Sequence, residues 1–247
     1  MFFKTDGVVL READYNDTDR MLTVLTRDSG RMTLKARGVR SSRSPLKAAC
    51  QLLTYSEFTV LERRGYLTVT EAVPKEMFLD LRSDLECLSL ASYFAQVAEV
   101  VSQEDSPNPQ LLSLLLNCMY ALGKLQKPQP LVKAVFELRT ACLAGYTPDL
   151  SGCAVCGNPT PDRFNVAHGV LQCEGCRAEE FDGLRLPVSE GMLMALHYLV
   201  ACGPKQLFSF QIGEKDMEAL SGLTETYLTT QLERGFFTLD FYKSLKL

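Results

Sequence analysis

Two closely spaced pairs of cysteines constrain this chain more than any other feature of its sequence. Cys153 and Cys156 are separated by two residues, sixteen residues follow, and Cys173 and Cys176 repeat the same spacing. Two intervening residues let both sulfur atoms of a pair reach one ion at about 2.3 Å, and two such pairs complete a tetrahedron. The sequence therefore predicts one four-thiolate metal site, with structural Zn²⁺ as the ion.

Three alternative interpretations of these cysteines are weaker. A redox pair needs a single CxxC motif at a helix start, an iron–sulfur cluster uses the same ligands, and a catalytic zinc keeps one position open for water. His168 could replace a cysteine, but it sits at the expected tip of a hairpin formed by residues 164–166 and 170–172. We expect it to be an exposed turn residue, and we expect His197 to pack in a helical core.

The remaining cysteines stand singly, and the total of nine is odd, so a disulfide framework is not expected. We expect these five to behave as small buried hydrophobes: Cys50, Cys87, Cys118, Cys142 and Cys202. The first residues do not resemble a secretory signal, and no apolar run reaches the roughly 18 residues of a membrane helix. These patterns predict a cytoplasmic protein that does not act at a membrane.

The first part of the chain has the pattern of short strands joined by tight turns. We expect strands at residues 7–10, 21–26, 31–39, 52–62 and 66–73, with turns at 28–30 and 63–65. Pro74 is expected to end the series. Five short strands in this space predict a small closed barrel such as an OB-fold, and a small open sheet is the alternative.

After Pro74 the apolar residues recur at helical spacing. We expect helices at residues 79–101, 110–125, 131–144, 188–201 and 214–234, and a short one from 237. Ser189 is a candidate N-cap, and Gly145 is a candidate C-cap. The predicted fold class is α+β: an N-terminal OB-fold β-barrel (1–78), then an all-α domain (79–149 and 183–247) with an inserted four-cysteine zinc finger (150–182).

Positive charge is concentrated in one segment of an acidic chain. The net charge is −4, yet residues 27–47 carry seven cations and one acid, so the segment is +6 and the remainder −10. The seven residues of this basic segment are our candidate nucleic-acid ligands: Arg27, Arg31, Lys35, Arg37, Arg40, Arg43 and Lys47.

The spacing of the cations in the basic segment places several of them on one face of a strand, as expected for a surface that binds a ligand. On a strand, Arg31, Lys35 and Arg37 point to one side, while the apolar residues between them point to the other. Residues 40–45 are expected to form a flexible basic loop. Strands 2 and 3 of an OB-fold and their loops bind oligonucleotides. Because residues 27–47 contain no aromatic side chain, we expect phosphate binding without base readout, on single or double strands.

The charge pattern is also compatible with three rival functions. The basic face could be a solvated surface, which would make the protein a structural adaptor. Alternatively, the chain could be an RNA-binding protein or a transcription factor with an OB-fold and a zinc ribbon. Asp14, Asp17 and Asp19 could hold a cation, as in a nuclease, although a polar loop is the favoured interpretation. The chain has no phosphate-binding loop motif and no nucleophile elbow. We therefore expect it not to be an enzyme, with no catalytic residues and no small-molecule substrate.

Several short motifs occur in order along the whole chain. In the N-terminal part they are Gly7–Arg11, Asp14–Arg20, Gly30 and Ala36–Arg40. In the C-terminal part they are Phe136–Arg139, Gly145–Pro148 and Cys153–Gly157. Each motif is short, but their combination is specific, and together they resemble the RecO family of bacterial DNA repair proteins.

The resemblance implies a recombination mediator in the bacterial cytoplasm, associated with the nucleoid. Such proteins bind single- and double-stranded DNA and anneal complementary strands. They act with RecR on strands coated by single-stranded DNA-binding protein (SSB), and they help to load the recombinase RecA. The resemblance also implies that the helical domain binds the C-terminal tail of SSB. Relatives differ in whether all four cysteines are kept, and this chain has all four.

Overall fold

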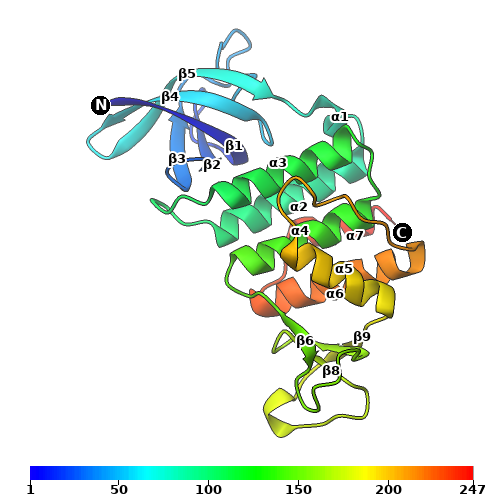
Figure 1. Ribbon diagram of the computed structural model, residues 1–247. Helices are drawn as coiled ribbons and strands as arrows, with labels where there is room; N and C mark the ends of the chain where they lie inside the picture. The colour runs from blue at the N-terminus through cyan, green and yellow to red at the C-terminus, as the bar shows by residue number, and fades with distance from the viewer. Residues whose placement is uncertain (247) are drawn as a thin grey trace. The chain divides into compact units, whose positions relative to one another are not determined.

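The computed structural model describes residues 1–246, and its N-terminal part is a closed barrel. The five strands are β1 (Phe2–Asp14), β2 (Arg20–Thr26), β3 (Arg31–Ala36), β4 (Tyr55–Arg63) and β5 (Tyr66–Glu76). They pair in the order β1-β2-β3-β5-β4, and β1 also pairs with β4, which closes the barrel (Figure 1). The β3–β5 pair is parallel and the others are antiparallel. The OB-fold prediction is confirmed, and the open sheet is excluded.

The strands differ from their predicted bounds where pairing extends them. Strand β1 begins at Phe2 because it pairs with β4 before it pairs with β2. Pro74 lies inside β5, where it opposes Ser56 beside an irregularity in the register, so the prediction that it ends the strand was wrong. Proline lacks an N–H, and a local irregularity in the ladder is a place where that loss is tolerated.

The segment between β3 and β4 closes one end of the barrel rather than forming a free loop. Consecutive turns are joined by backbone bonds, such as Lys47 N to Ser44 O at 3.2 Å and Cys50 N to Leu46 O at 3.0 Å. Leu46 and Cys50 are buried in the barrel core with Leu34 and Phe58. Residues 40–45 form mostly exposed turns, as expected of a loop, and the buried residues just after them anchor the segment, while the flexibility of the loop stays a prediction.

Four helices belong with the barrel: α1 (Leu79–Arg82), α2 (Leu85–Val101), α3 (Pro109–Gly123) and α7 (Phe237–Ser244). The predicted helix 79–101 is interrupted because Asp84 caps a new helix by accepting a hydrogen bond from the backbone N–H of Cys87. Helix α7 packs beside α2, with buried Phe236 edge-on to Tyr93 at 5.5 Å between ring centres (Figure 1).

The other compact unit, Lys127–Gly235, contains α4 (Gln129–Leu143), α5 (Glu190–Ala201) and α6 (Glu214–Gln231). Ser189 caps α5 by accepting from Met192 N at 3.1 Å, as predicted. His197 is exposed, so the prediction of a core histidine was wrong. Its neighbours Leu196 and Leu199 are buried, and His197 lies on the opposite face of the same helix.

A small four-stranded sheet of the second unit carries the cysteine pairs. Its strands are β6 (Asp149–Cys153), β7 (Arg163–Asn165), β8 (Val170–Gln172) and β9 (Arg185–Pro187), in the order β6-β8-β7-β9. A single-turn helix, η1, covers Glu179–Phe181. β7 and β8 form the predicted antiparallel hairpin, and β6 pairs in parallel with β8. This parallel pairing brings the first cysteine pair beside the second.

A buried ionic network joins α4 to α6. Lys133 Nζ lies 3.0 Å from Glu137 Oε1 and 2.9 Å from Glu225 Oε2, and Thr224 donates to Glu137 at 2.8 Å. Burial raises the pKa of Glu137, and the adjacent Lys133 acts in the opposite direction. Arg139 donates to the carbonyl of Leu199 at the end of α5. The Phe136–Arg139 motif therefore ties three helices together.

Two findings complete the fold. Among the five single cysteines, Cys50, Cys118 and Cys202 are buried as predicted, whereas Cys87 and Cys142 are half-buried. Within residues 1–246, no helix combines the length and the apolar character needed to cross a bilayer. The division into barrel, helical domain and zinc finger at the predicted boundaries stays a prediction.

Gly30 is a point of close backbone contact between the barrel and the segment after α2. Its φ is +66°, and a Cβ there would lie 2.4 Å from the carbonyl oxygens of Gln103 and Ser106. We expect Gly30→Ala to lower the free energy of unfolding by about 2 to 4 kcal/mol, from overpacking and left-handed strain together. Urea unfolding followed by circular dichroism measures this change.

Gly65→Ala is the matched control for that substitution. Gly65 has a φ of +78°, but no atom lies within 4 Å of the position that a Cβ would take, so only the backbone strain of about 1–2 kcal/mol applies. Equal destabilisation by the two substitutions would contradict the role of close contact at Gly30.

Candidate metal site and nucleic-acid interface

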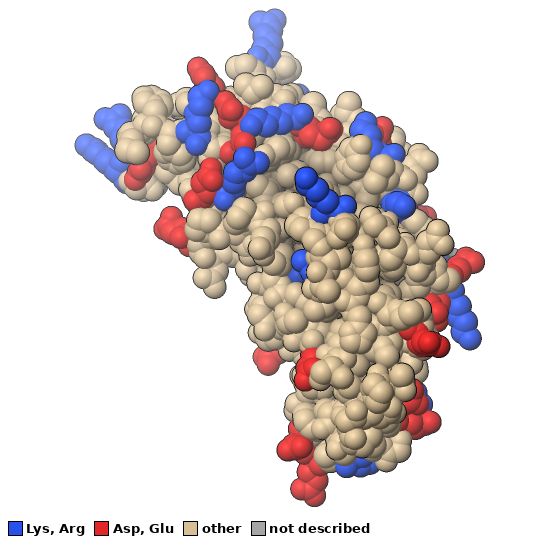
Figure 2. All heavy atoms as spheres, viewed as in Figure 1, with Lys and Arg blue, Asp and Glu red and all other residues tan. Residues whose placement is uncertain are grey.

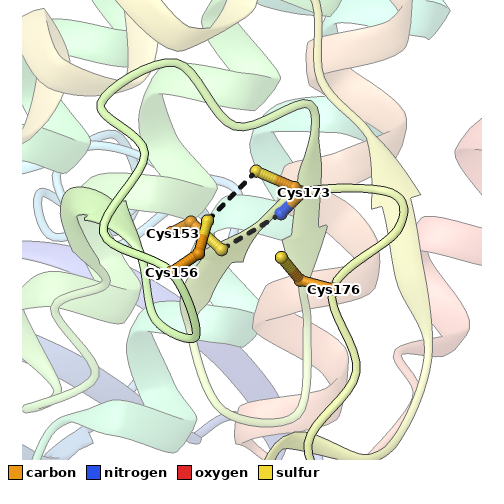
Figure 3. A group of neighbouring side chains, drawn as sticks. All are labelled: Cys153, Cys156, Cys173 and Cys176. Atoms are coloured by element: carbon orange, nitrogen blue, oxygen red, sulfur yellow. Dashed lines mark hydrogen bonds between the residues drawn. The ribbon is translucent and has the colours of Figure 1, made fainter.

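The four paired cysteines come together at one point. Cys153 ends β6 and Cys156 follows in the next turn, whereas Cys173 and Cys176 follow β8. Their sulfur atoms all lie within 4.8 Å of one another and face a common centre (Figure 3). All four are free thiols in this structure. The arrangement has the ligand number and closeness of a tetrahedral four-thiolate site.

Hydrogen bonds from the surrounding chain reach these sulfurs. The backbone N–H of Cys173 donates to Cys153 Sγ at 3.3 Å, and Asn158 Nδ2 donates to Cys173 Sγ at 3.2 Å. The turn is closed by Gly157 N, which donates to the carbonyl of Cys153 at 2.8 Å. Such donors orient thiolate ligands and offset their negative charge.

The thiols affect one another's ionisation. Burial raises the pKa of Cys153, but backbone N–H groups of Cys156, Val155 and Cys173 act against it and hold that pKa at about 6. The hydrogen bond with Cys156 is the main cause that raises the pKa of Cys176 to about 12, helped by burial and by Cys153. Four adjacent thiolates repel one another, so full deprotonation requires a cation at their centre.

The cysteine sheet is anchored to α6 on its other side. Phe164 packs edge-on against Tyr227 with ring centres 5.1 Å apart, and Gln231 donates to the carbonyl of Val166 at 2.8 Å. Arg185 holds the second cysteine turn through the carbonyl of Cys176 at 2.8 Å. His168 is exposed in the β7–β8 turn, as predicted, and it is outside the cysteine group.

The basic segment divides between the two ends of the barrel strands. Lys35 and Arg40 contact the loop between β1 and β2. Arg31 lies at the start of β3, where its guanidinium donates to the backbone carbonyl of Glu99 in α2. Arg37 lies six positions after Arg31, just past the end of β3, or roughly 20 Å further along the extended chain. The predicted alternation is present, since Thr33 and Arg37 are exposed while Met32, Leu34 and Ala36 are buried.

The acidic loop before β2 positions cations instead of offering a cation site. Asp19 accepts from the backbone N–H of Gly38 at 2.9 Å and from Lys35 at 3.1 Å, and these bonds hold its pKa well below the usual range. Asp14 pairs with Arg20 at 2.8 Å and with Arg40 at 3.4 Å. Within residues 1–246, the cysteines are the only group whose ligand atoms are placed for a metal ion.

Four cations of the basic segment are exposed and form no ion pair within residues 1–246: Arg27, Arg37, Arg43 and Lys47. Residues 1–78 contain 13 Lys and Arg against 10 Asp and Glu, a net charge of +3, so the rest of the chain is −7. Figure 2 shows the basic side chains over the barrel interspersed with acidic ones. We therefore expect an anion to be attracted mainly to these four cations, which form no ion pair in residues 1–246, and not to the barrel surface as a whole.

An exposed aromatic residue beside Lys35 was not among the predicted nucleic-acid ligands, because it lies outside residues 27–47. Tyr15 is 61% exposed in the β1–β2 loop, and Lys35 Nζ lies 4.3 Å from the centre of its ring. A flat exposed ring beside basic side chains is the arrangement on which nucleic-acid bases stack. Its place between Asp14 and Asn16 in the polar loop was the available signal.

Comparisons with known proteins match nearly the whole chain to one family. The family described as Recombination protein O N terminal matches residues 1–78, and Recombination protein O C terminal matches residues 82–240. The DNA repair protein RecO of Acetivibrio thermocellus is 34% identical over 99% of this chain and 97% of its own. That of Moorella thermoacetica is 33% identical over 94% of this chain and 87% of its own. The chain therefore belongs to the RecO family of DNA repair and recombination proteins.

Proposed function

We propose that this protein is a non-enzymatic recombination mediator whose barrel binds single- and double-stranded DNA through backbone phosphates. The observation that carries the proposal is the set of exposed, unpaired cations on a closed OB barrel: Arg27, Arg37, Arg43 and Lys47. Phosphate neutralisation is independent of base identity, so the binding is not sequence-specific. Tyr15, beside Lys35, adds a stacking surface for unpaired bases.

Annealing follows from the same electrostatics. Cations that neutralise phosphates of one strand lower the repulsion that opposes the approach of a complementary strand. This step requires no nucleotide hydrolysis and no catalytic residue. Family membership supports action on SSB-coated strands together with RecR, recognition of the SSB C-terminal tail, and loading of RecA. This work on DNA would take place in the bacterial cytoplasm, at the nucleoid.

We also propose that Cys153, Cys156, Cys173 and Cys176 bind one structural Zn²⁺. Four sulfurs within 4.8 Å of one another, with donors aimed at two of them, fit this ion. A four-thiolate site leaves no position open for water, so the ion would stabilise the small sheet and take no part in catalysis.

The test of DNA binding is neutralisation of two unpaired cations, Arg37→Gln with Arg43→Gln. Both side chains are exposed, so their loss leaves the fold intact. We expect the affinity for a single-stranded oligonucleotide to fall about tenfold, and the slope of log affinity against log salt to decrease by about 1.4, or 0.7 for each phosphate contact. Fluorescence anisotropy across a salt series measures both quantities, and a strand-annealing assay reports the activity.

Arg63→Gln with Arg64→Gln is the matched control. These two arginines are exposed at the β4–β5 turn, on the same barrel but outside the basic segment. We expect this pair to change affinity and salt slope less than the first pair. Equal effects would show that net charge alone governs binding. Efficient annealing of RNA but not of DNA would favour an RNA-binding function instead.

A further inference from the structure

A cavity of about 450 Å³ opens between the barrel and α2 within the first unit. Its charged lining consists of four cations and one acid: Arg20, Arg40, Lys47, Arg82 and Glu12. Its apolar lining includes Val39, Leu52 and Leu88. Neither Arg20 nor Arg82 is part of the basic segment, so the cavity extends the positive surface beyond the residues predicted to bind DNA.

Arg82 is the unusual member of this lining. Its half-buried guanidinium donates to the carbonyl of Leu52 at 2.6 Å, to Thr54 Oγ1 at 3.2 Å and to the carbonyl of Met77 at 3.3 Å. All three partners are neutral, and among residues 1–246 no carboxylate forms an ion pair with Arg82. Burial lowers the pKa of Arg82, and the charge of Glu12 acts against that change. Since arginine stays protonated in proteins, Arg82 brings a positive charge to the cavity, and no ion-pair partner holds it within residues 1–246.

The other cations of the lining differ in how far they are neutralised. Arg20 forms ion pairs with two carboxylates, Glu12 at 2.7 Å and Asp14 at 2.8 Å, so its charge is neutralised. Arg40 shares Asp14 at 3.4 Å. Lys47 is exposed and has no ion pair in the described chain. The cavity therefore has a net positive charge centred on Lys47 and Arg82, which selects an anion.

We propose that this cavity binds one phosphate group of a single DNA strand, with Lys47 and Arg82 as its ligands and the attached nucleotide against the apolar wall. The proposal rests on the proposed DNA-binding function. The cavity is continuous with the candidate DNA surface, because Arg40 and Lys47 belong both to the basic segment and to the cavity lining. The volume lies within the range of small-ligand sites and admits one nucleotide unit of a strand.

The experiment compares three cavity variants with one control. Lys47→Gln removes an unpaired charge, Arg82→Gln removes the half-buried one, and Ser92→Phe fills the cavity from α2 while every cation remains. Arg63→Gln removes an exposed cation outside the cavity. The probe is a 5′-labelled single-stranded oligonucleotide, and its affinity is measured by anisotropy across a salt series. A duplex of the same sequence is measured in parallel.

We expect Lys47→Gln and Arg82→Gln each to weaken single-strand binding about three- to tenfold and to reduce the salt slope by about 0.7. Ser92→Phe is expected to weaken single-strand binding to a similar degree and duplex binding less. Arg63→Gln is expected to bind like the wild type. Arg82 also donates hydrogen bonds to Leu52 and Thr54, so the thermal unfolding of the Arg82→Gln variant is recorded as well. If Arg82→Gln does not fold, the affinities of Lys47→Gln and Ser92→Phe decide whether the cavity binds DNA.

The outcomes separate this proposal from the proposed function. If the wild type binds DNA and all three cavity variants bind equally well, the cavity proposal is wrong while the DNA-binding function stands. If the wild type does not bind DNA at all, both fail. If DNA binding is unchanged while binding of a hexaglutamate peptide is lost in Lys47→Gln, the cavity serves an acidic protein segment and the phosphate proposal is overturned.

Discussion

Replacing Cys173 with serine is expected to remove the metal ion from the cysteine site and to unfold the small sheet around it. Cys173 is central to this site, because its backbone N–H donates to Cys153 and its sulfur accepts from Asn158. The strands of this sheet are only three to five residues long, and their buried apolar side chains are Leu150, Phe164 and Leu171, so we expect metal binding to supply most of the folding free energy around the cysteines. For structural zinc that contribution is on the order of 10 kcal/mol.

Metal analysis of the purified protein measures the first effect, and limited proteolysis of residues 149–187 measures the second. Cys87→Ser is the control, because Cys87 is a half-buried single cysteine outside the site. We expect one ion per chain in the wild type and in the control, and none in Cys173→Ser. DNA affinity is expected to change much less than sheet stability, since the basic segment belongs to the other compact unit. A wild-type protein without bound metal would refute the zinc proposal.

Replacing Lys133 with methionine is expected to destabilise the second unit by about 3 to 5 kcal/mol. Lys133 is 4% exposed and Glu137 is fully buried, so the substitution leaves a buried carboxylate without its principal counter-charge. Glu225 of α6 also loses its ion pair with Lys133 of α4. Chemical denaturation followed by circular dichroism gives the change in the unfolding midpoint.

The double substitution Lys133→Met with Glu137→Leu distinguishes the contribution of the ion pair from the cost of leaving the Glu137 carboxylate buried alone. Removing both buried charges eliminates the desolvation cost of Glu137, so the double variant is expected to be more stable than Lys133→Met alone. A double variant less stable than the single one would show that Glu137 contributes mainly through Thr224 and not through Lys133.

The sequence was most informative where local pattern and long-range structure agree. The cysteine spacing correctly predicted that four sulfur atoms come together, because short-range geometry decides which sulfurs of each pair can approach one point. The strand alternation of Arg31–Ala36 was predictable, since one face of a barrel strand must be buried. Bounds were missed where pairing partners set them, as for β1, which continues along β4.

The sequence indicated which cations belong to the candidate DNA surface, but not which of them form ion pairs with acidic residues. Counting cations in residues 27–47 could not show that Asp14 and Asp19 fold back onto Arg40 and Lys35, since those contacts depend on the β1–β2 loop. The exposure of His197 depends on which face of α5 packs inward, which neighbouring elements decide. The cavity at Arg82 joins residues from four separate stretches of chain, so no local pattern indicates it.

The return of the chain to its first unit has a consequence for synthesis. Helix α7 and Phe236 complete the packing around Tyr93, although all of residues 127–235 intervene between them and α3. Chains emerge from the ribosome N-terminal end first, at about 5–20 residues per second. The barrel-bearing unit therefore has to wait several seconds after its own strands are made before its last helix can dock. During that interval Tyr93 of α2 lacks its contact with Phe236, so we expect the first unit to reach its full stability only after the second unit has been made.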